Sequence, residues 1–450
     1  MNTSCRKDLE FEPSGNTAFH FSQDTVFLDT VFTKSNSETF LVKVFNKTST
    51  DYLISKLYLN QKDKSPFRIN VDGRTGYEFN EVALRANDSL MIFVEIALGD
   101  NNNDWLAEDE IMVGNKQQIK LLAAVESAIY HYPSKDQEAS EITNNTVWTQ
   151  DKAHIIYGTL QIKENKKLEI EAGTRIYMHQ NSRLIVEKNA ALIANGLNDK
   201  KIIFRSDRQT TRYDTLPKQW NEIKLLPGSK FEGHNVQIKG ANNGLNLDHA
   251  MANLRNVEIY NAGSSGIFSN HSEITGRNVV ISDAGNASLN IENGGKYTFY
   301  FSSFANEGKS GVVGASGPNI PLYLSDYTAI EGQEITSPLH ATFINSIFYG
   351  RYPNGAILDF KNKNQAAYIF ESCVIKNEDK NTLDYATDSN FKNIITADPL
   401  FTSTIYSDQN LRLKPESPAK LKGNPLYINE SPFDLDGIKR NNKPSIGAYN

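Results

Sequence analysis

A nine-residue segment recurs three times in the middle of the chain and constrains the fold more than any other feature. The copies are HNVQIKGAN (234–242), RNVEIYNAG (255–263) and RNVVISDAG (277–285). Their valines, Val236, Val257 and Val279, are 21 and 22 residues apart. A fixed period of this length indicates a solenoid. Alternating β-branched residues exclude a helical repeat, so we expect each repeat to form one coil of a parallel β-helix with three short strands.

One asparagine in each copy is expected to stack on the next. Asn235, Asn256 and Asn278 occupy equivalent positions, so in stacked coils they would lie about 4.8 Å apart and could form a hydrogen-bonded ladder. A buried amide that lacks partners costs roughly 1–3 kcal/mol. We therefore predict that these three asparagines have a structural role.

The position four residues after each valine is expected to form a turn. Gly240, Asn261 and Asp283 share little chemistry, but all three tolerate a positive φ better than other residue types. A left-handed residue at the end of each strand accounts for this set. Asp283 is therefore interpreted as a turn residue and not as a catalytic acid.

The sequence predicts an all-β chain with two folded domains. Short apolar runs with period-two alternation, separated by turn signals about every ten residues, predict an immunoglobulin-like β-sandwich over residues 26–130. Residues 131–146 are polar and lack periodicity, which is typical of a linker. The parallel β-helix is expected over 147–396, and residues 397–450 are expected to close it as a C-terminal segment packed on the solenoid.

Composition excludes several classes of partner. The net charge of −6 gives no general attraction to phosphate backbones, so no nucleic acid is expected. No apolar stretch approaches the roughly 20 residues of a membrane-spanning helix. The two cysteines, Cys5 and Cys373, cannot build a disulfide framework, and neither has zinc-ligand spacing. Cys373 lies in an alternating apolar run and is expected to be a small buried hydrophobe.

No metal site or cofactor is expected from the sequence. The acidic loop 100–110 is rich in oxygen ligands, but a calcium loop of the EF type requires Gly at its sixth position and Glu at its twelfth. Counted from Asp100, these positions hold Trp105 and Ile111. The loop is therefore interpreted as a solvated acidic turn.

The N-terminal segment, residues 1–25, suggests a lipid anchor and tether. It has neither the basic region nor the apolar region of a secretory signal. Its TSC resembles the last letters of a bacterial lipoprotein cleavage box, after which Cys5 would carry the lipid, with Met1 as a start-site artefact. The following RKD is similar to the signal that sends lipoproteins of Bacteroidota to the cell surface. The alternative is a free thiol on a frayed terminus.

Two groups of segments resemble right-handed parallel β-helix lipoproteins of Bacteroidota, which have a pectate-lyase-like fold. The opening is carried by VWTQDKAHIIYG (147–158), LEIEAGTRIYMH (168–179), LIVEKNAALIANG (184–196), IIFRSDR (202–208) and LPKQWNEIKLLPGS (216–229). The tail is carried by ADPLF (397–401), LRLKPESPAK (411–420) and DLDGIKRNNKPSIGAYN (434–450). One position departs from the family pattern: Asn221 stands where a glycine is expected in the QW-G-I turn. The resemblance covers most of 147–450, and a preceding sandwich is common in the same lipoproteins. It implies the fold and a surface location, but this fold carries lyases, hydrolases and binding surfaces alike.

No catalytic residue is assigned from the sequence. The pieces nearest to the elements of β-helix galacturonan hydrolases, Gly233-His234-Asn235 and Gln237-Ile238-Lys239, already belong to the repeat. A lyase would need carboxylates or cations that converge from neighbouring coils, but Asp248, Asp283 and Glu292 occupy different repeat positions. Asp248 and His249 are adjacent in an expected strand, where neighbouring side chains point to opposite faces.

Aromatic residues in the later coils suggest a binding role. They are Tyr297, Phe299, Phe301, Phe348, Tyr349, Tyr352 and Tyr368. Most are expected in the core, and a few exposed rings would form a platform for a sugar or a protein partner.

The leading hypothesis is a non-enzymatic, surface-exposed outer-membrane lipoprotein. Its β-helix would present a rigid surface to a protein or glycan, as a scaffold or within a larger outer-membrane assembly. The alternative is a polysaccharide lyase or hydrolase that acts on an acidic glycan.

Overall fold

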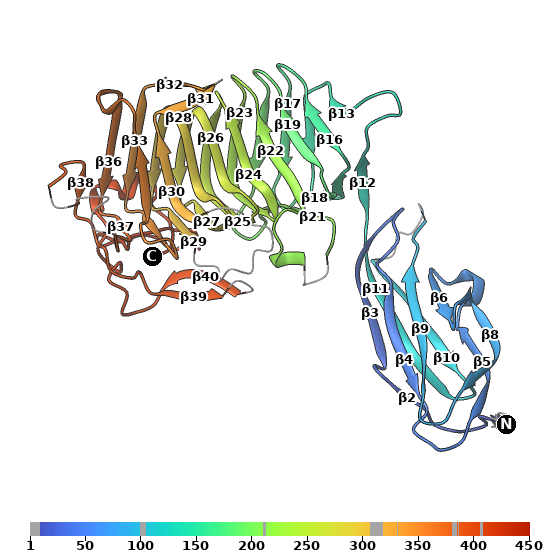
Figure 1. The fold of residues 1–450 in the computed structure, drawn as a ribbon. Helices are drawn as coiled ribbons and strands as arrows, with labels where there is room; N and C mark the ends of the chain where they lie inside the picture. The colour runs from blue at the N-terminus through green and yellow to red at the C-terminus, as the bar shows by residue number, and fades with distance from the viewer. Residues whose placement is uncertain are drawn as a thin grey trace, which may run out of the picture. The chain divides into compact units, whose positions relative to one another are not determined.

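The chain folds into two compact units that are both built from β-strands (Figure 1). The computed structural model describes residues 10–99, 105–209, 213–306, 318–330, 332–379, 385, 387–405 and 408–450. The units are Met1–Ala128 and Ile129–Asn450. The first is a two-sheet sandwich and the second is a parallel β-helix, which confirms the predicted all-β fold class.

The sandwich pairs two sheets over one apolar core. The first sheet has the order β1 (Glu12–Pro13), β5 (Tyr52–Leu59), β10 (Leu106–Val113), β11 (Gln117–Glu126) and β3 (Thr25–Phe32), with β8 (Glu78–Leu84) beside β5. The second has the order β2 (His20–Phe21), β4 (Phe40–Phe45), β9 (Ser89–Ile96), β6 (Phe67–Val71) and β7 (Arg74–Gly76). A single 3₁₀ turn, η1 (Lys62–Lys64), precedes β6. Side chains alternate between the core and solvent along each strand. In β4, Val42 and Val44 are buried, whereas the neighbouring Leu41 is 41% exposed.

The structure corrects two of the expected boundaries. Strands β1 and β2 pair within the sandwich, so the described part of the expected tether, 10–25, belongs to this unit. The segment 131–146, expected to be a linker, contributes β-helix strands. Its strand Ala139–Ile142 pairs in parallel with Thr159–Ile162. The sequence rule failed here because the first coil is short and polar, and only Ala139 and Ile142 of its first strand are buried.

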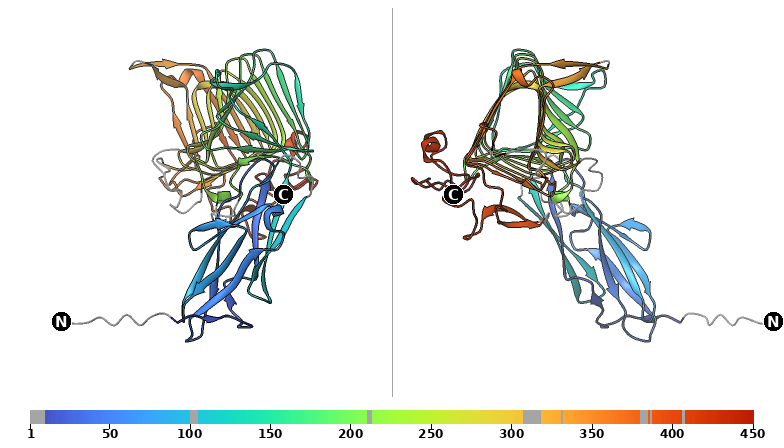
Figure 2. Two further views of the ribbon diagram at one scale, coloured as in Figure 1. Left: turned by 90° about the vertical axis from the view of Figure 1, so that its right-hand side faces the viewer. Right: turned by 60° about the vertical axis from the view of Figure 1, so that its left-hand side comes forward.

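The β-helix stacks its strands in three parallel columns (Figure 2). Column 1 contains β13 (Ala139–Ile142), β16 (Thr159–Ile162), β19 (Arg183–Val186), β22 (Trp220–Leu225), β24 (Ala241–Asp248), the first parts of β26 (Ser265–Arg277) and β28 (Ala287–Tyr300), then β30 (Ile320–Ser325) and β35 (Ala356–Asp359). Column 2 contains β14 (Thr146–Trp148), β17 (Lys167–Glu171), β20 (Ala191–Asn195), the first parts of β23 (Lys230–Lys239) and β25 (Met251–Ala262), the second parts of β26 and β28, then β33 (Leu339–Ile344), β36 (Ala366–Glu371) and β38 (Phe391–Lys392).

Column 3 completes each coil. It contains β12 (Ala128–His131), β15 (Ala153–Ile156), β18 (Arg175–Met178), β21 (Ile202–Ser206), the second parts of β23 and β25, then β27 (Val280–Ala284), β29 (Ser303–Asn306), β34 (Ile347–Gly350) and β37 (Val374–Ile375). The described residues of this unit also form the 3₁₀ turns η2 (Tyr213–Thr215), η3 (Lys363–Gln365) and η4 (Pro425–Glu430).

One continuous apolar core fills the interior of the β-helix. The inward residues of one coil lie over those of the next, so like side chains pack in files. Phe299, Phe343, Phe370 and Phe391 form such a file, with ring centroids 5.8, 4.9 and 5.1 Å apart. Cys373 is completely buried, and burial raises the pKa of its thiol to about 12. The aromatic residues of the later coils therefore serve mainly as core.

The three asparagines of the repeat lie in one column at the corner between columns 2 and 3. Asn256 Nδ2 donates to Asn235 Oδ1 at 3.0 Å, and Asn278 Nδ2 donates to Asn256 Oδ1 at 2.8 Å. Asn235 Nδ2 donates to the backbone oxygen of Gly196 at 3.0 Å. All three asparagines have left-handed backbones, with φ of 50–55°, so one residue type both turns the corner and supplies the ladder.

The left-handed corner continues beyond the repeat, but the ladder does not. Phe301 follows Asn278 at this position with φ of 49°, and Asn345 follows with φ of 51°. The guanidinium of Arg440, from the C-terminal segment, covers the Phe301 ring at 4.0 Å and donates to Asn278 Oδ1 at 3.0 Å. The C-terminal segment therefore fills the position where the ladder lacks an amide.

The C-terminal segment, 397–450, packs against the outward face of column 3. Its hairpin strands β39 (Phe401–Ile405) and β40 (Asp408–Leu413) pair with each other. Apolar residues of the segment share a cluster with outward residues of column 3: Val280, Ala305, Ile347 and Val374 from the β-helix, with Phe401, Leu411, Leu413, Ala419, Leu435, Ile446, Ala448 and Tyr449 from the segment. Asn345 Nδ2 donates to the backbone oxygen of Asn424 at 3.0 Å, and Asn345 Oδ1 accepts a hydrogen bond from the backbone N–H of Asn424 at 2.6 Å.

The expected turn residues also lie in one column, at the ends of the column 3 strands. Gly240, Asn261 and Asp283 have φ of 72°, 56° and 56°. Gln409 Nε2 of the C-terminal hairpin donates to the side chains of both Asn261 and Asp283. The carboxylate of Asp283 is 4% exposed, and these contacts explain its presence without a catalytic role.

A pair of histidines lies in the first coil of the β-helix. His131 Nε2 and His154 Nδ1 are 3.0 Å apart, and Trp148 stacks on His154 at 3.9 Å. Burial lowers the pKa of His131 to about 4 and that of His154 to about 3, the second with a further contribution from His131. Both rings are therefore neutral when the coil is folded at pH 7.

Two substitutions of Asn256 distinguish the contribution of the ladder to stability from that of the turn. Asn256→Gly keeps a backbone that accepts positive φ but removes two side-chain hydrogen bonds, so we expect a loss of about 1–3 kcal/mol in the free energy of unfolding. Asn256→Ala should cost about 1–2 kcal/mol more because it also strains the left-handed turn. Chemical denaturation measures both. Asn165→Gly is the control, because Asn165 is exposed with φ of 62°, and it should change stability little. Equal stability of Asn256→Gly and the wild type would contradict the ladder.

The histidine pair predicts a loss of stability in acid. The folded pKa values lie below the ordinary 6.5, so the unfolded chain binds more protons as pH falls from about 6.5 toward 4. The stabilisation is complete above pH 6.5. At about 1.4 kcal/mol per pKa unit, each histidine should contribute a loss on the order of 3 kcal/mol between pH 7 and pH 4, so the pair should lower the stability of the β-helix by on the order of 6 kcal/mol. The variant His131→Phe/His154→Phe keeps flat rings and should lose less. Thermal unfolding across this range measures the difference, and identical pH dependence would refute the assignment.

Candidate functional site

The outward face of column 1 carries a row of aligned side chains with diverse chemistry. Strand pairing places one residue per coil in this row: Lys224, Asn246, Phe268, Asn290, Tyr323 and Ile357. Because side chains alternate along each strand, Leu245 and Leu247 beside Asn246 point into the core. We call this row and its outward neighbours the column 1 face.

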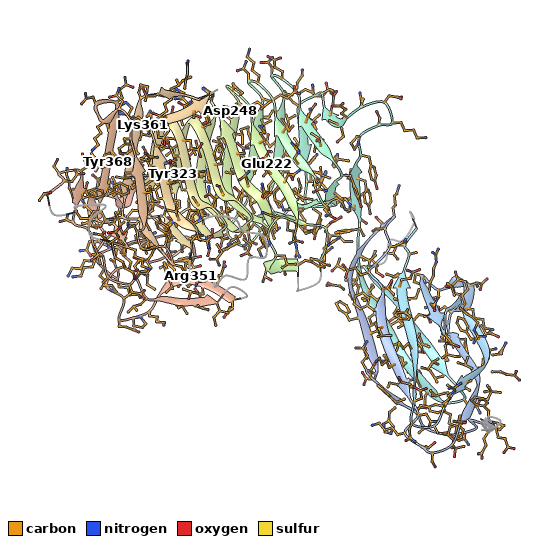
Figure 3. The ribbon with its side chains drawn as sticks, in the orientation of Figure 1. Glu222, Asp248, Tyr323, Arg351, Lys361 and Tyr368 are labelled. Carbon is orange, nitrogen blue, oxygen red and sulfur yellow. The ribbon has the colours of Figure 1, made fainter. Side chains whose placement is uncertain are left out.

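Glu222 fixes the amides at the early end of the column 1 face. Its Oε2 accepts a hydrogen bond from Asn243 Nδ2 at 3.1 Å and from Asn246 Nδ2 at 2.9 Å. Figure 3 shows Glu222, Asp248 and Tyr323 on the β-helix. The carboxylate therefore orients two amides of the following coil, and the Asn243 carbonyl oxygen in turn accepts a hydrogen bond from the backbone N–H of Ser265 at 3.2 Å.

A second polar ladder runs along the corner between columns 1 and 2. Asn270 Nδ2 donates to Asp248 Oδ1 at 2.8 Å, and Asn293 Nδ2 donates to Asn270 Oδ1 at 3.1 Å. Ser337 Oγ continues the ladder with a bond of 2.8 Å to Asn293 Oδ1. The ladder borders the column 1 face along several coils. Asp248, Asn270 and Asn293 are 22 and 23 residues apart, so their spacing in the sequence already indicated that they stack.

Asp359 organises the late end of the face. Its Oδ2 accepts hydrogen bonds from the hydroxyls of Tyr323 at 2.9 Å and Tyr327 at 2.8 Å. Tyr327 begins a hairpin of β31 (Tyr327–Ile330) and β32 (Gln333–Thr336). Lys361 lies 4.8 Å from the Tyr327 ring and forms an ion pair with Glu334 at 2.8 Å. Burial and the bond to Asp359 raise the pKa of Tyr323, so this phenol stays protonated.

The column 1 face suits a ligand rich in hydroxyl groups. Four carboxylates lie on it, Glu222, Asp248, Glu292 and Asp359, against two lysines, Lys224 and Lys361. The excess of negative charge disfavours polyanions. The partly exposed rings of Phe268 and Tyr323 provide apolar surface beside fixed amides and carboxylates, and such a mixture suits a sugar chain.

The residues considered as catalytic pieces do not converge. His234 lies at the end of column 2, whereas Lys239 lies at the end of column 3 beyond the turn at Asn235. Burial lowers the pKa of Lys239, against the opposing charge of Asp214. Asp248 borders column 1, and Asp283 lies at the end of column 3. These residues belong to different faces of the coil.

One expectation about Asp248 and His249 is wrong. The two side chains were expected to point to opposite faces, but His249 Nδ1 lies 2.7 Å from Asp248 Oδ1. Strand β24 ends at Asp248, and His249 has a left-handed backbone with φ of 49°. The alternation rule does not apply because the chain turns between the two residues.

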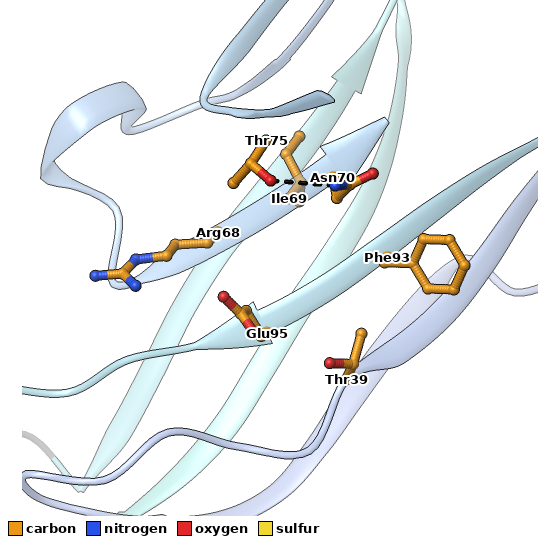
Figure 4. Close-up of a pocket in the computed structure, with 7 residues that line it drawn as sticks. All are labelled: Thr39, Arg68, Ile69, Asn70, Thr75, Phe93 and Glu95. Carbon is orange, nitrogen blue, oxygen red and sulfur yellow. Dashed lines mark hydrogen bonds between the residues drawn. The ribbon is translucent and has the colours of Figure 1, made fainter. Parts of the chain in front are cut away.

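The sandwich has a separate shallow hollow of about 320 Å³ (Figure 4). Arg68 and Glu95 flank it, with Phe93 on the neighbouring strand, and Asn70 Nδ2 donates to Thr75 Oγ1 at 3.1 Å. Phe93 is 39% exposed. This hollow has no aligned row of polar groups comparable to the column 1 face.

Several expectations fall on other parts of the chain. Cys5 and residues 100–104 of the acidic loop lie outside the described residues. In the ranges that the structure describes, no three His, Cys, Asp or Glu side chains are grouped to hold a metal ion. None of the helices in these same ranges combines the length and apolar character needed to cross a bilayer.

Exposed aromatic residues occur at the first coils, where sequence reasoning did not place them. Tyr132 is 56% exposed and stacks on Tyr157 at 4.8 Å, and Tyr157 stacks on His179 at 4.3 Å. His179 Nδ1 lies 2.6 Å from Asp207 Oδ2. The rings stack on one another and form a group separate from the column 1 face.

Comparison with known proteins adds no assignment. No protein-family model matches the chain, and no curated protein matches it.

Proposed function

We propose that this protein is a non-enzymatic lipoprotein at the outer surface of a bacterial outer membrane, and that its β-helix binds a glycan along the column 1 face. The observation that carries the binding role is the alignment of fixed amides, carboxylates and two rings across successive coils. Phe268 and Tyr323 stand in one row, separated by the coil of Asn290, which is itself only 3% exposed. Such a row provides repeated contacts to a repeating ligand.

The rigidity of the face supports recognition. Glu222 and Asp359 hold neighbouring polar groups in place before any ligand arrives. Side chains that are ordered in advance lose less conformational entropy on binding. The same hydrogen bonds occupy the carboxylates, which favours binding over acid–base catalysis.

Charge decides which glycans we expect to bind. The negative excess of the column 1 face favours uncharged chains over pectin or alginate. The alternative function, a lyase or hydrolase that acts on an acidic glycan, needs cations beside the substrate carboxylates. Lys224 and Lys361 are the lysines assigned above to the column 1 face, and Lys361 is already paired with Glu334.

A binding assay with face variants tests the proposal. Affinity electrophoresis against neutral polysaccharides (xylan, glucomannan and β-glucan) should show retardation of the wild type. Phe268→Ala and Tyr323→Ala should each weaken binding about fivefold, because a stacked ring contributes on the order of 1 kcal/mol. Phe27→Ala, which removes a 55% exposed ring of the sandwich, is the control. If all variants bind as the wild type does, the column 1 face is not the site.

The same preparation separates binding from catalysis. Incubation with pectin, alginate and chondroitin should produce no new ultraviolet absorbance and no reducing ends. Activity that is lost in Glu222→Gln or Lys239→Met would establish the enzyme alternative. Binding of a protein, detected by co-purification from native membranes in place of glycan binding, would favour a role as an assembly subunit.

The anchor is tested on the native protein. We expect mass spectrometry of the N-terminal peptide to find acyl chains on Cys5, and added protease to remove the protein from intact cells. Cys5→Ser should release it from the membrane fraction. An unmodified N-terminus on the native protein would reject the anchor and leave the glycan-binding proposal standing.

A further inference from the structure

Two histidines on neighbouring coils face one hollow of the β-helix surface. His249 and His271 follow the paired residues Asp248 and Asn270, and their ring centroids are 5.1 Å apart with a tilt of 42°. The hollow has a volume of about 470 Å³ and is open to solvent. His340 also lines it, so it gathers three of the eight histidines of the chain.

Hydrogen bonds fix the tautomer of both rings. His271 Nδ1 lies 2.9 Å from the backbone oxygen of Asn293, and His249 Nδ1 lies 2.7 Å from Asp248 Oδ1. A carbonyl or carboxylate oxygen can only accept, so each Nδ1 carries the proton. In the neutral ring, each Nε2 then has a free lone pair. Histidines that bind metals have this arrangement, in which the second nitrogen donates to a carboxylate or carbonyl.

Both histidines turn the corner between columns 1 and 2. His249 and His271 have φ of 49° and 43°, in the left-handed region that His, like Asn and Asp, adopts more often than other residue types do. The next coil has Asn293 at the equivalent position, with φ of 60°. Asparagine therefore suits the same backbone.

We propose that His249 and His271 bind a divalent transition-metal ion, such as Cu²⁺ or Zn²⁺, through their Nε2 atoms. Imidazole suits these ions. Metal–nitrogen bonds of about 2.0–2.1 Å join nitrogens roughly 3–4 Å apart, a separation that small rotations of two rings with centroids 5.1 Å apart can reach. Two imidazoles do not complete a coordination shell, so water occupies the remaining positions. The site borders the column 1 face and shares Asp248 with it, but metal binding does not depend on glycan binding.

Asn270 and Asp248 hold the pair in position. Asp248 Oδ1 accepts hydrogen bonds from both His249 Nδ1 and Asn270 Nδ2. The ladder at this corner therefore orients the His249 ring. The second ring is oriented through Asn293, whose side chain belongs to the same ladder. One ladder therefore positions both imidazoles.

Titration of the full chain with Cu²⁺ tests the proposal. We expect one ion bound, with nitrogen hyperfine splitting from two imidazoles in electron paramagnetic resonance. His249→Asn and His271→Asn should each weaken binding at least tenfold and leave a one-nitrogen signal. Asparagine suits the left-handed turn, so these variants should fold, and circular dichroism checks this.

His179→Asn is the matched control. His179 also has its Nδ1 bound to a carboxylate, that of Asp207, but its ring stacks on Tyr157 and not on a second histidine. This variant should bind Cu²⁺ as the wild type does. Retained affinity in His249→Asn/His271→Asn, or equal loss in His179→Asn, would overturn the proposal. A rise in melting temperature with Zn²⁺ that is absent in the double variant would support it independently of spectroscopy.

Discussion

The middle coils of the β-helix depend on a left-handed corner that repeats from one coil to the next and that supplies its own hydrogen bonds. Where the chain turns between columns 2 and 3, Asn235, Asn256 and Asn278 adopt positive φ and bond to one another. The amide satisfies the polar atoms that the turn would bury, and its small side chain tolerates the turn itself. The corner fixes which residues lie above one another in successive coils. The alignment of the apolar side chains in the core follows from it.

The C-terminal segment completes what the ladder leaves open. At Phe301 the corner keeps its backbone but loses the amide, and Arg440 occupies that place with a bond to Asn278. Burial lowers the pKa of Arg440 to about 10, yet the group remains charged at neutral pH. Its bonds to the carbonyl oxygens of Gly447 and Ala448 distribute that charge within the segment. The later strands of column 3 are thereby covered, whereas column 1 remains open as a surface.

The sequence predicted the parts of the fold that repeat with the same letters. Val236, Val257 and Val279 marked the coils because identical residues recur at nearly constant spacing. The second ladder was missed because Asp248, Asn270 and Asn293 are chemically mixed and their spacing changes from 22 to 23. The first coil was mistaken for a linker because it has few buried residues. The column 1 face could not be foreseen, since Phe268, Asn290 and Tyr323 become neighbours only through pairing across coils of unequal length.

Both proposed sites depend on this register. A one-residue shift in any coil would turn Phe268 or Tyr323 into the core and separate His249 from His271. The most direct measurement is therefore a crystal structure of the full chain. The account predicts Asn235, Asn256 and Asn278 in one file, with Nδ2–Oδ1 distances near the 3.0 and 2.8 Å described above. Asparagines scattered over different faces of the coil would contradict it.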